Sequence, residues 1–455
     1  MASSQHIIYK QLLDTLEEYD ITYAILRDNL SSPEPIRDLD LLIDSRQVIL
    51  FDDCAHQNEF HLVKDSYFNP GKRVYIHAKT GTTYMVDLHL MMVCRGLEFM
   101  DATSMLQNRV KREGYYYLAQ EDHYLALLFH NVLAKKRIQD KHSPLLRKFS
   151  MNGFDVTQLQ NKMAPFGLDH VFLQLSENFD RACEDSTYVR KINKSARSTL
   201  TKRPANLGRR IGIRLRRVYA FLFGKPKGVV VTFMGPDGTG KSTTIKAVQE
   251  RLSQVGLNAK IAYMGPWGDS ILKLRMLFFW LNPNPYRADY KLYYSGKLDK
   301  KPGPLSGIKK WRLNFRSSLY YFFTVIEMWT RWHVRVLPAL RLGRIVLADR
   351  YIYDMLTGYK NRPMDYQVNI REKICKKYPS PDLGILLDSE PEIIHKRKPQ
   401  LTLNQLEMSR MLYKHVADKF DFIRLDTSHS VEETLKDFDS HILPVIVSSY
   451  SKRRK

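Results

Sequence analysis

Apolar residues follow two patterns along this chain, one that predicts strands and one that predicts helices. Short apolar runs bounded by turn residues predict strands at residues 22–26, 37–44, 83–90, 229–233, 259–264 and 344–351. Amphipathic stretches predict helices at residues 7–19, 123–136, 155–184, 243–252 and 319–341. From residue 228 on, strands alternate with helices, which is typical of an α/β domain with a parallel sheet flanked by helices. The earlier elements predict a separate α+β domain.

The 455 residues are enough for two or three domains. The patterns divide them into an α+β domain at residues 1–150, a helical and basic linker at 151–227, and an α/β domain at 228–455. Within the last domain, residues 269–317 form an insertion rich in Tyr, Pro, Lys and Arg. Because loops of this length are usually functional, we expect the insertion to bind an acceptor or to form a lid.

A glycine-rich turn follows the apolar run at 229–233 and matches G-x-x-x-x-G-K-[ST] in full. The residues expected to bind phosphate are Gly235, Asp237, Gly238, Thr239, Gly240, Lys241, Ser242 and Thr243. The glycines let successive N–H groups face one hollow, and the next helix adds its positive end. Lys241 reaches the outer phosphates, and the Ser242 hydroxyl suits Mg²⁺. Strand, turn and helix stand in the required order, so we expect a triphosphate, ATP, to bind here.

An acidic and a basic residue, Asp349 and Arg350, directly follow another apolar run. Open parallel sheets bind ligands at the carboxyl ends of their strands, so we expect this pair to lie beside the phosphate-binding turn. There the carboxylate suits Mg²⁺ or activation of an acceptor, and the guanidinium suits phosphate charge.

Acidic side chains also stand on the predicted strands of the first domain. Asp38 and Asp40 are two residues apart, so they share one face of a strand, and Asp87 stands within the run at 83–90. Three such carboxylates can hold one or two Mg²⁺ ions. With this D-x-D pattern and a third acid, residues 5–150 resemble the minimal nucleotidyltransferases. The resemblance implies metal-dependent nucleotidyl transfer, or a related fold that has lost its chemistry.

Two histidines of this domain, His89 and His130, are candidates to contact a substrate phosphate, although buried histidines often only pack. The resemblance also has a departure. Nucleotidyltransferases usually carry a Gly-Ser pair before D-x-D to hold the triphosphate, and Arg27-Asp28 stand in that place here.

The formal net charge of +23 indicates polyanionic partners. Thirteen Lys and Arg residues and no acid lie between Asp185 and Asp237, and residues 209–223 alternate basic with large apolar side chains. This segment suits an anionic membrane surface, with nucleic acid as the weaker alternative. A solvated linker, or a helix docked between domains, explains the pattern almost as well.

The four cysteines are far apart in the sequence and indicate neither a disulfide framework nor a zinc site. The first residues lack the pattern of a signal peptide, and we expect no transmembrane helix. These features predict a cytoplasmic protein, whose basic segment would meet the inner face of the membrane.

The second domain resembles the thymidylate kinases over residues 228–447. The resemblance rests on Pro338-Ala339-Leu340, the glycine and strand after them, and Asp349-Arg350-Tyr351, with later matches at 381–388, 391–398, 422–427 and 431–434. It implies a P-loop sheet of the nucleoside-monophosphate-kinase type. It also implies that Lys241 and Arg397 neutralise the transferred phosphoryl group, that Ser242 and Asp349 serve Mg²⁺, and that Arg350 meets the acceptor or the γ-phosphate.

The acceptor site departs from that family. Thymidylate kinases carry a base-recognising arginine on the helix before Pro-Ala-Leu, and Met328 stands there, with Arg331 nearly a turn away. Residues 351–354 are aromatic and acidic enough to receive a sugar ring. We therefore expect an ATP- and Mg²⁺-dependent phosphotransferase acting on a nucleoside monophosphate or a glycan sugar. The alternative is a nucleotide-sensing regulatory protein at a membrane or on nucleic acid. The aromatic helix at 319–332 is a candidate homodimer contact.

Overall fold

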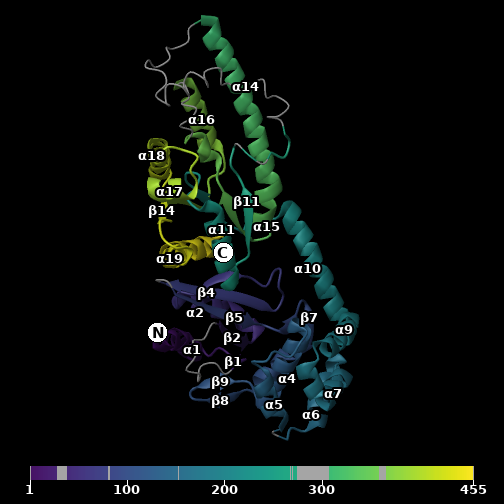
Figure 1. Ribbon diagram of the computed structural model, residues 1–455. Helices are drawn as coiled ribbons and strands as arrows, with labels where there is room; N and C mark the ends of the chain where they lie inside the picture. The colour runs from purple at the N-terminus through teal and green to yellow at the C-terminus, as the bar shows by residue number, and fades with distance from the viewer. Residues whose placement is uncertain are drawn as a thin grey trace. The chain divides into compact units, whose positions relative to one another are not determined.

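The computed structural model describes residues 2–27, 38–79, 82–151, 153–266, 268, 270–273, 307–357 and 365–453. The chain divides into two compact units, and the boundary falls inside helix α10 (Pro204–Phe223), between Tyr219 and Ala220. In Figure 1 the first unit is purple to blue and the second is teal to yellow.

The first unit is built on a mixed sheet of seven strands in the order β3-β4-β5-β2-β1-β9-β8. The strands are β1 (Tyr23–Ile25), β2 (Asp38–Ile43), β3 (His61–Lys64), β4 (Lys72–Lys79), β5 (Thr82–His89), β8 (Val110–Arg112) and β9 (Tyr115–Tyr117). A hairpin of β6 (Met92–Cys94) and β7 (Leu97–Met100) stands apart from this sheet. Strand β2 runs parallel to β5 with Asp40 opposite Asp87, so the predicted acids lie on adjacent strands.

Helices surround this sheet and form a second core. They are α1 (Ala2–Glu18), α2 (Val48–Gln57), α3 (Ala102–Gln107), α4 (Gln120–His130), α5 (Ser143–Met151), α6 (Val156–Met163), α7 (Asp169–Glu177), α8 (Phe179–Glu184) and α9 (Ser186–Lys202). Side chains of α9 such as Val189, Ile192 and Leu200 are buried in one cluster with those of α4 and α7. The structure thus differs from the predicted linker at 151–227, because most of these residues complete the first unit.

The second unit contains a five-stranded sheet in the order β11-β12-β10-β13-β14, and each of its strand pairs is parallel. The strands are β10 (Val230–Met234), β11 (Ala259–Tyr263), β12 (Ile345–Asp349), β13 (Leu383–Asp388) and β14 (Ile423–Asp426). All five residues of β10 are buried, as expected for a central strand that is covered on both faces. The predicted α/β class, a parallel sheet flanked by helices, is confirmed.

The helices of this unit are α11 (Lys241–Gln254), α14 (Gly307–Arg331), α15 (Leu337–Arg341), α16 (Asp365–Lys377), α17 (Pro391–Arg397), α18 (Leu403–Lys419), α19 (Val431–Asp437) and α20 (Leu443–Lys452). Helix α14 begins earlier than predicted and includes the end of the expected insertion at 269–317. Most of that insertion, with the acceptor or lid role assigned to it, lies outside the described residues. Among the described helices, none is both long and apolar enough to cross a bilayer.

Candidate functional site

The phosphate-binding turn lies between the central strand β10 and helix α11, so the predicted residues from Gly235 to Thr243 are contiguous at the carboxyl end of the sheet. Gly235 has a φ of 151°, and a Cβ placed on it would lie 2.4 Å from the backbone oxygen of Leu387 in β13. No other residue fits this position without moving β13. Gly240 then precedes α11 with a φ of 82° and lets the chain enter the helix.

The side chain of Lys241 lies over this turn and is buried. Its ammonium group donates hydrogen bonds to the backbone oxygens of Gly235 at 2.9 Å and Pro236 at 2.6 Å. Burial and the positive charge of Arg350 lower the pKa of Lys241 to about 8. The ammonium group is therefore held at the place where outer phosphates would meet it, in a setting that favours its binding an anion.

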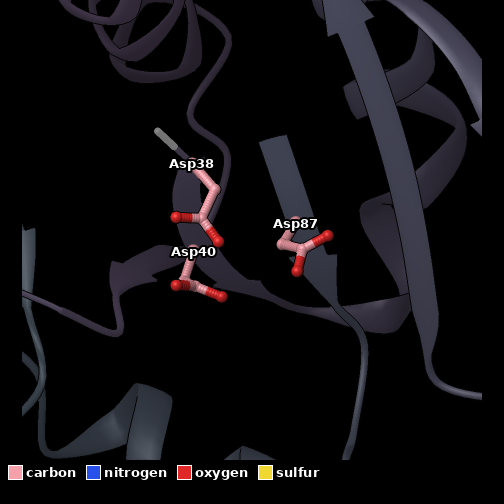
Figure 2. Close-up of side chains that lie close together, drawn as sticks. All are labelled: Asp38, Asp40 and Asp87. Carbon is pink, nitrogen blue, oxygen red and sulfur yellow. The ribbon is translucent and has the colours of Figure 1, made fainter. Parts of the chain in front are cut away.

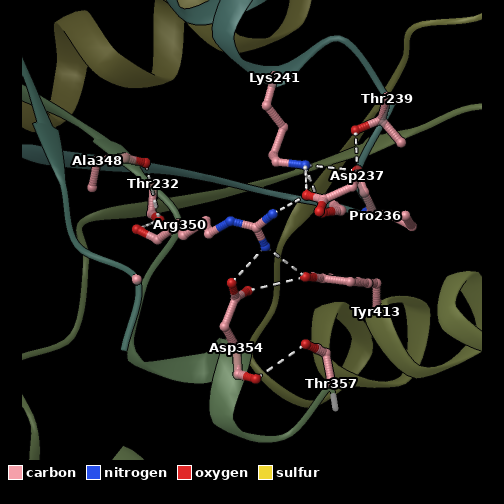
Figure 3. A network of polar contacts seen from close by, with 12 residues as sticks. Thr232, Pro236, Asp237, Thr239, Lys241, Ala348, Arg350, Asp354, Thr357 and Tyr413 are labelled. Carbon is pink, nitrogen blue, oxygen red and sulfur yellow. Dashed lines mark hydrogen bonds and ion pairs between the residues drawn. The ribbon is translucent and has the colours of Figure 1, made fainter. Parts of the chain in front are cut away.

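Arg350 joins the turn to the neighbouring strand. Strand β12 pairs with β10 so that Asp349 stands opposite Phe233, and Arg350 follows with a left-handed φ of 64°. Its guanidinium donates hydrogen bonds to Asp354 at 2.7 Å, to the hydroxyl of Tyr413 at 3.1 Å, and to Asp237 of the turn (Figure 3). The structure thus brings the two predicted segments together through Arg350.

Of the three partners of Arg350, Asp237 was predicted as a phosphate-binding residue, Asp354 was predicted only as part of the segment 351–354, and Tyr413 was not predicted. The carboxyl group of Asp354 is buried, and burial raises its pKa even though Arg350 opposes that shift. Tyr413 belongs to α18 and is also buried. The spacing of four residues between Arg350 and Asp354 was the available signal for this ion pair, whereas nothing local to Arg350 pointed to Tyr413.

The residue after α17, Lys398, lies close to the turn. Arg397 is the last residue of α17 and is exposed. The next residue, Lys398, has its ammonium group 3.9 Å from the carboxylate of Asp237. Although burial opposes it, the charges of Arg350, Lys241 and Lys398 hold the pKa of Asp237 below its ordinary value. Lys398 therefore belongs to the basic surroundings of the turn.

The expectation that residues 351–354 receive a sugar ring is wrong. Tyr351 is fully buried and donates its hydroxyl to the backbone oxygen of Pro379 at 2.6 Å. Tyr353 is buried as well and stacks on Phe420 with ring centroids 4.2 Å apart. Both side chains therefore belong to the hydrophobic core of the second unit.

Helix α14 and the loop after β11 are joined by a buried ion pair. Arg331 and Glu327 are 0% and 1% exposed, and their side chains meet at 2.9 Å. Arg331 also donates hydrogen bonds to the backbone oxygens of Gly265, at 2.5 Å, and Gly268. Met328, in the base-recognising position of the resembled family, is fully buried. Neither residue of α14 therefore presents a free polar group to an acceptor.

The predicted acid cluster of the first unit also forms. Ligand atoms of Asp38, Asp40 and Asp87 lie within 4.8 Å of one another (Figure 2). Asp40 is 4% exposed, and its Oδ2 accepts no hydrogen bond within the described part of the chain. Three hard oxygen donors this close together are suited to a divalent cation, although Arg27 forms an ion pair with Oδ2 of Asp40.

Two cationic side chains and a histidine lie around this cluster. Lys72 lies 2.6 Å from Asp87, Arg27 lies 3.3 Å from Asp40, and Nε2 of His89 lies 3.7 Å from Asp40. His130 remains neutral near pH 7, because burial and the charge of Arg27 lower its pKa to about 3. His89 thus lies beside the acids, whereas His130 brings no positive charge to a phosphate. Sequence reasoning missed Lys72, since β4 was not predicted as a strand.

The comparisons with known proteins agree with the geometry of the second unit. No family model matches the chain. A thymidylate kinase of Leptospira interrogans serogroup Icterohaemorrhagiae serovar copenhageni is 27% identical over 228 residues, which cover 48% of this chain and 96% of the relative. A probable thymidylate kinase of Archaeoglobus fulgidus is 33% identical over 156 residues, 32% of this chain and 78% of the relative. A Bacillus licheniformis thymidylate kinase is 28% identical, covering 46% and 92%. Each match spans no more than about half of this chain.

Proposed function

Because the chain belongs to the thymidylate kinase family, we propose that its second unit transfers the γ-phosphoryl group of ATP to a nucleoside monophosphate. The observation that carries this proposal is the buried ammonium group of Lys241, held over the phosphate-binding turn between β10 and α11. Phosphoryl transfer requires little covalent chemistry from the protein, since positioning and charge neutralisation supply most of the rate. A turn rich in N–H groups with a fixed cation can both position the phosphates and neutralise their charge.

The roles of the individual residues follow from their places around the turn. Lys241 and Arg350 neutralise the transferred phosphoryl group, and Arg397 joins them from the end of α17. The hydroxyl of Ser242 and the carboxylate of Asp349 are hard oxygen donors, so they fit Mg²⁺ as it arrives with ATP. When bound, this ion supplies charge neutralisation between the phosphates.

The acceptor that we propose is a nucleoside monophosphate other than dTMP. The guanidinium of Arg331 is fully engaged by Glu327 and two backbone oxygens, and Met328 is buried. A thymine base would therefore find no free arginine on α14. The burial of Tyr351 and Tyr353 removes the feature that had favoured a sugar, so a glycan acceptor becomes the weaker alternative.

The test is ADP formation from ATP with each common nucleoside monophosphate and with a panel of free sugars. Lys241→Ala is the control, because it removes the cation and leaves the turn. We expect Lys241-dependent turnover with a nucleoside monophosphate and weaker turnover with dTMP. Preference for dTMP would refute the acceptor assignment and keep the kinase. ATP binding without Lys241-dependent turnover on any acceptor would refute the kinase proposal and favour the regulatory alternative.

For the first unit we propose metal-dependent nucleotidyl transfer, which the cluster of Asp38, Asp40 and Asp87 supports. The test begins with Mn²⁺ binding, followed by paramagnetic resonance on the full chain. We expect Asp40→Asn to abolish the bound signal and Lys72→Met to strengthen binding, since Lys72 competes for Asp87 at 2.6 Å. Unchanged binding in Asp40→Asn would refute the site. Bound Mn²⁺ without pyrophosphate release from any nucleoside triphosphate would refute the transfer activity.

A further inference from the structure

Helix α10 carries a continuous row of exposed apolar side chains. Its 20 residues form one helix without a break. The row and its exposed fractions are Leu207 46%, Ile211 47%, Leu215 64%, Val218 57% and Leu222 47%. At 3.6 residues per turn, spacings of three and four place these side chains along one stripe of the helix. We call this set the apolar row.

The opposite face of α10 is the one that attaches the helix to the first unit. Asn206 is fully buried, and its side chain pairs with both backbone groups of Glu98 at 3.0 and 3.2 Å. Arg209 forms an ion pair with Glu98 at 3.0 Å, and Ile213 packs against Gly96. The apolar row therefore points away from the face that holds the helix, which argues against a helix that is simply docked in the core.

A second row, of arginines, runs beside the first. Arg214 and Arg217 each stand one residue before a member of the apolar row and follow its edge. Arg210 also precedes a member of the row, but it is half-buried and donates a hydrogen bond to Thr201 at 3.0 Å, so it is not part of this surface. Arg214 and Arg217 are exposed. No acidic residue occurs between Asp185 and Asp237, so no carboxylate of the helix itself neutralises them. We call Arg214 and Arg217 the arginine row.

We propose that α10 lies flat on an anionic phospholipid surface. The apolar row enters the boundary between headgroups and acyl chains, and the arginine row pairs with headgroup phosphates beside it. The positive charge of the helix complements a negatively charged bilayer, which commits the proposal to that occupant. This inference does not depend on the proposed kinase activity.

Nucleic acid is a poorer match for the same surface. A duplex would contact the arginine row through its phosphates but leave the apolar row in water. Lipid uses both rows at once. Substitutions in the apolar row therefore distinguish lipid from nucleic acid. They should weaken binding to lipid and leave binding to nucleic acid unchanged.

The test is flotation of the full chain with vesicles. One set contains equal amounts of phosphatidylglycerol and phosphatidylcholine, and the other is pure phosphatidylcholine. We expect binding to the anionic vesicles and little to the neutral ones. Leu215→Gln with Val218→Gln should weaken binding at least about tenfold. Arg214→Gln with Arg217→Gln should weaken it about 25-fold, since each arginine near an anionic surface contributes about fivefold.

Two control variants remove a similar pair of apolar side chains and a similar pair of charges from exposed positions outside α10. Ile49→Gln with Val110→Gln changes residues that are 73% and 40% exposed, and Arg190→Gln with Lys194→Gln removes two exposed charges from α9. Both controls should bind like the unmodified protein, and unchanged thermal unfolding shows that every variant folds. Equal binding to both vesicle types, or equal losses in controls and α10 variants, would overturn the proposal. Salt-sensitive binding to DNA without vesicle binding would overturn it in favour of a nucleic-acid surface.

Discussion

The buried ion pair between Glu327 and Arg331 provides a test of how helix α14 and the loop after β11 are held together. Glu327 accepts hydrogen bonds from the backbone N–H groups of Ile271, at 2.6 Å, and Leu272, at 2.9 Å, as well as from Arg331. The perturbation is Glu327→Gln, which keeps the size of the side chain and removes its charge. It leaves a guanidinium that is 0% exposed without a counter-charge.

The expected loss is large for one substitution. Breaking a buried ion pair by removing one partner costs about 3–5 kcal/mol, because the remaining charge stays out of water. For a unit of this size each kcal/mol shifts the unfolding temperature by roughly 2–4 °C, so we expect a decrease of about 6–20 °C in the unfolding of the second unit. Urea unfolding followed by tryptophan fluorescence should give the free-energy loss directly.

An ion pair on α18 whose glutamate is exposed supplies the control. Glu407 is 50% exposed and lies 3.9 Å from Arg410, so Glu407→Gln should cost no more than about 1 kcal/mol. Arg331→Met should be as harmful as Glu327→Gln. The double variant should lose less than the sum of the two, by about 0.5–3 kcal/mol. A loss below about 1 kcal/mol in Glu327→Gln, or strict additivity, would refute the reasoning.

The stability loss caused by Glu327→Gln should depend on pH. Burial tends to raise the pKa of Glu327, but the hydrogen bonds from Ile271, Leu272 and Arg331 outweigh it and lower the pKa. A lowered folded-state pKa contributes stability above the ordinary pKa of a glutamate, and this contribution is lost as the pH falls through the folded value. The difference between the unmodified protein and Glu327→Gln should therefore shrink in acid. A difference that stayed constant down to acidic pH would contradict the assigned charge.

Three further predictions concern the phosphate-binding turn. Gly235→Ala should abolish nucleotide binding, measured with a fluorescent ATP analogue, because its Cβ would lie 2.4 Å from a backbone oxygen of β13; binding near the unmodified affinity would contradict this. Since the pKa of Lys241 is about 8, ATP affinity measured by calorimetry should fall as the pH rises through 8, with proton uptake on binding; a flat profile would argue against a buried cation. Asp354→Asn should lower kcat up to about 100-fold with little change in ATP affinity, because Arg350 loses the group that positions it; an unchanged kcat would exclude that role.

The site could be predicted from the sequence where its chemistry is local. The phosphate-binding turn and the pair Asp38 and Asp40 were found because glycine spacing and a period of two fix the geometry within a few residues. Tyr413 could not be found, because it reaches Asp354 from 59 residues away in another helix. Such a partner depends on how α18 packs on the sheet.

The elements of the fold likewise differ in how well the sequence predicted them. Strands β10, β11 and β12 of the second unit were predicted from short apolar runs, and β13 and β14 from the resemblance to the thymidylate kinases. Strand β8 (Val110–Arg112) is exposed and mostly polar and gave no signal. Residues of α9 were assigned to a linker because the segment is rich in Lys and Arg, a composition typical of exposed linkers. That face, with Val189, Ile192 and Leu200, has helical spacing and is buried. The basic residues of this helix therefore lie on its exposed face, and its apolar residues belong to the core.

The order of strands in the second unit has a consequence for synthesis of the chain. Strand β10 emerges first but lies in the middle of the sheet, and its two neighbours are β12 and β13. The backbone N–H of Val230 is bonded at 2.7 Å to the side chain of Asp382, 152 residues later. Such distant pairing makes folding slow and leaves strand edges open meanwhile. The first unit can therefore complete its core before β13, a neighbour of β10 in the sheet, has been synthesised.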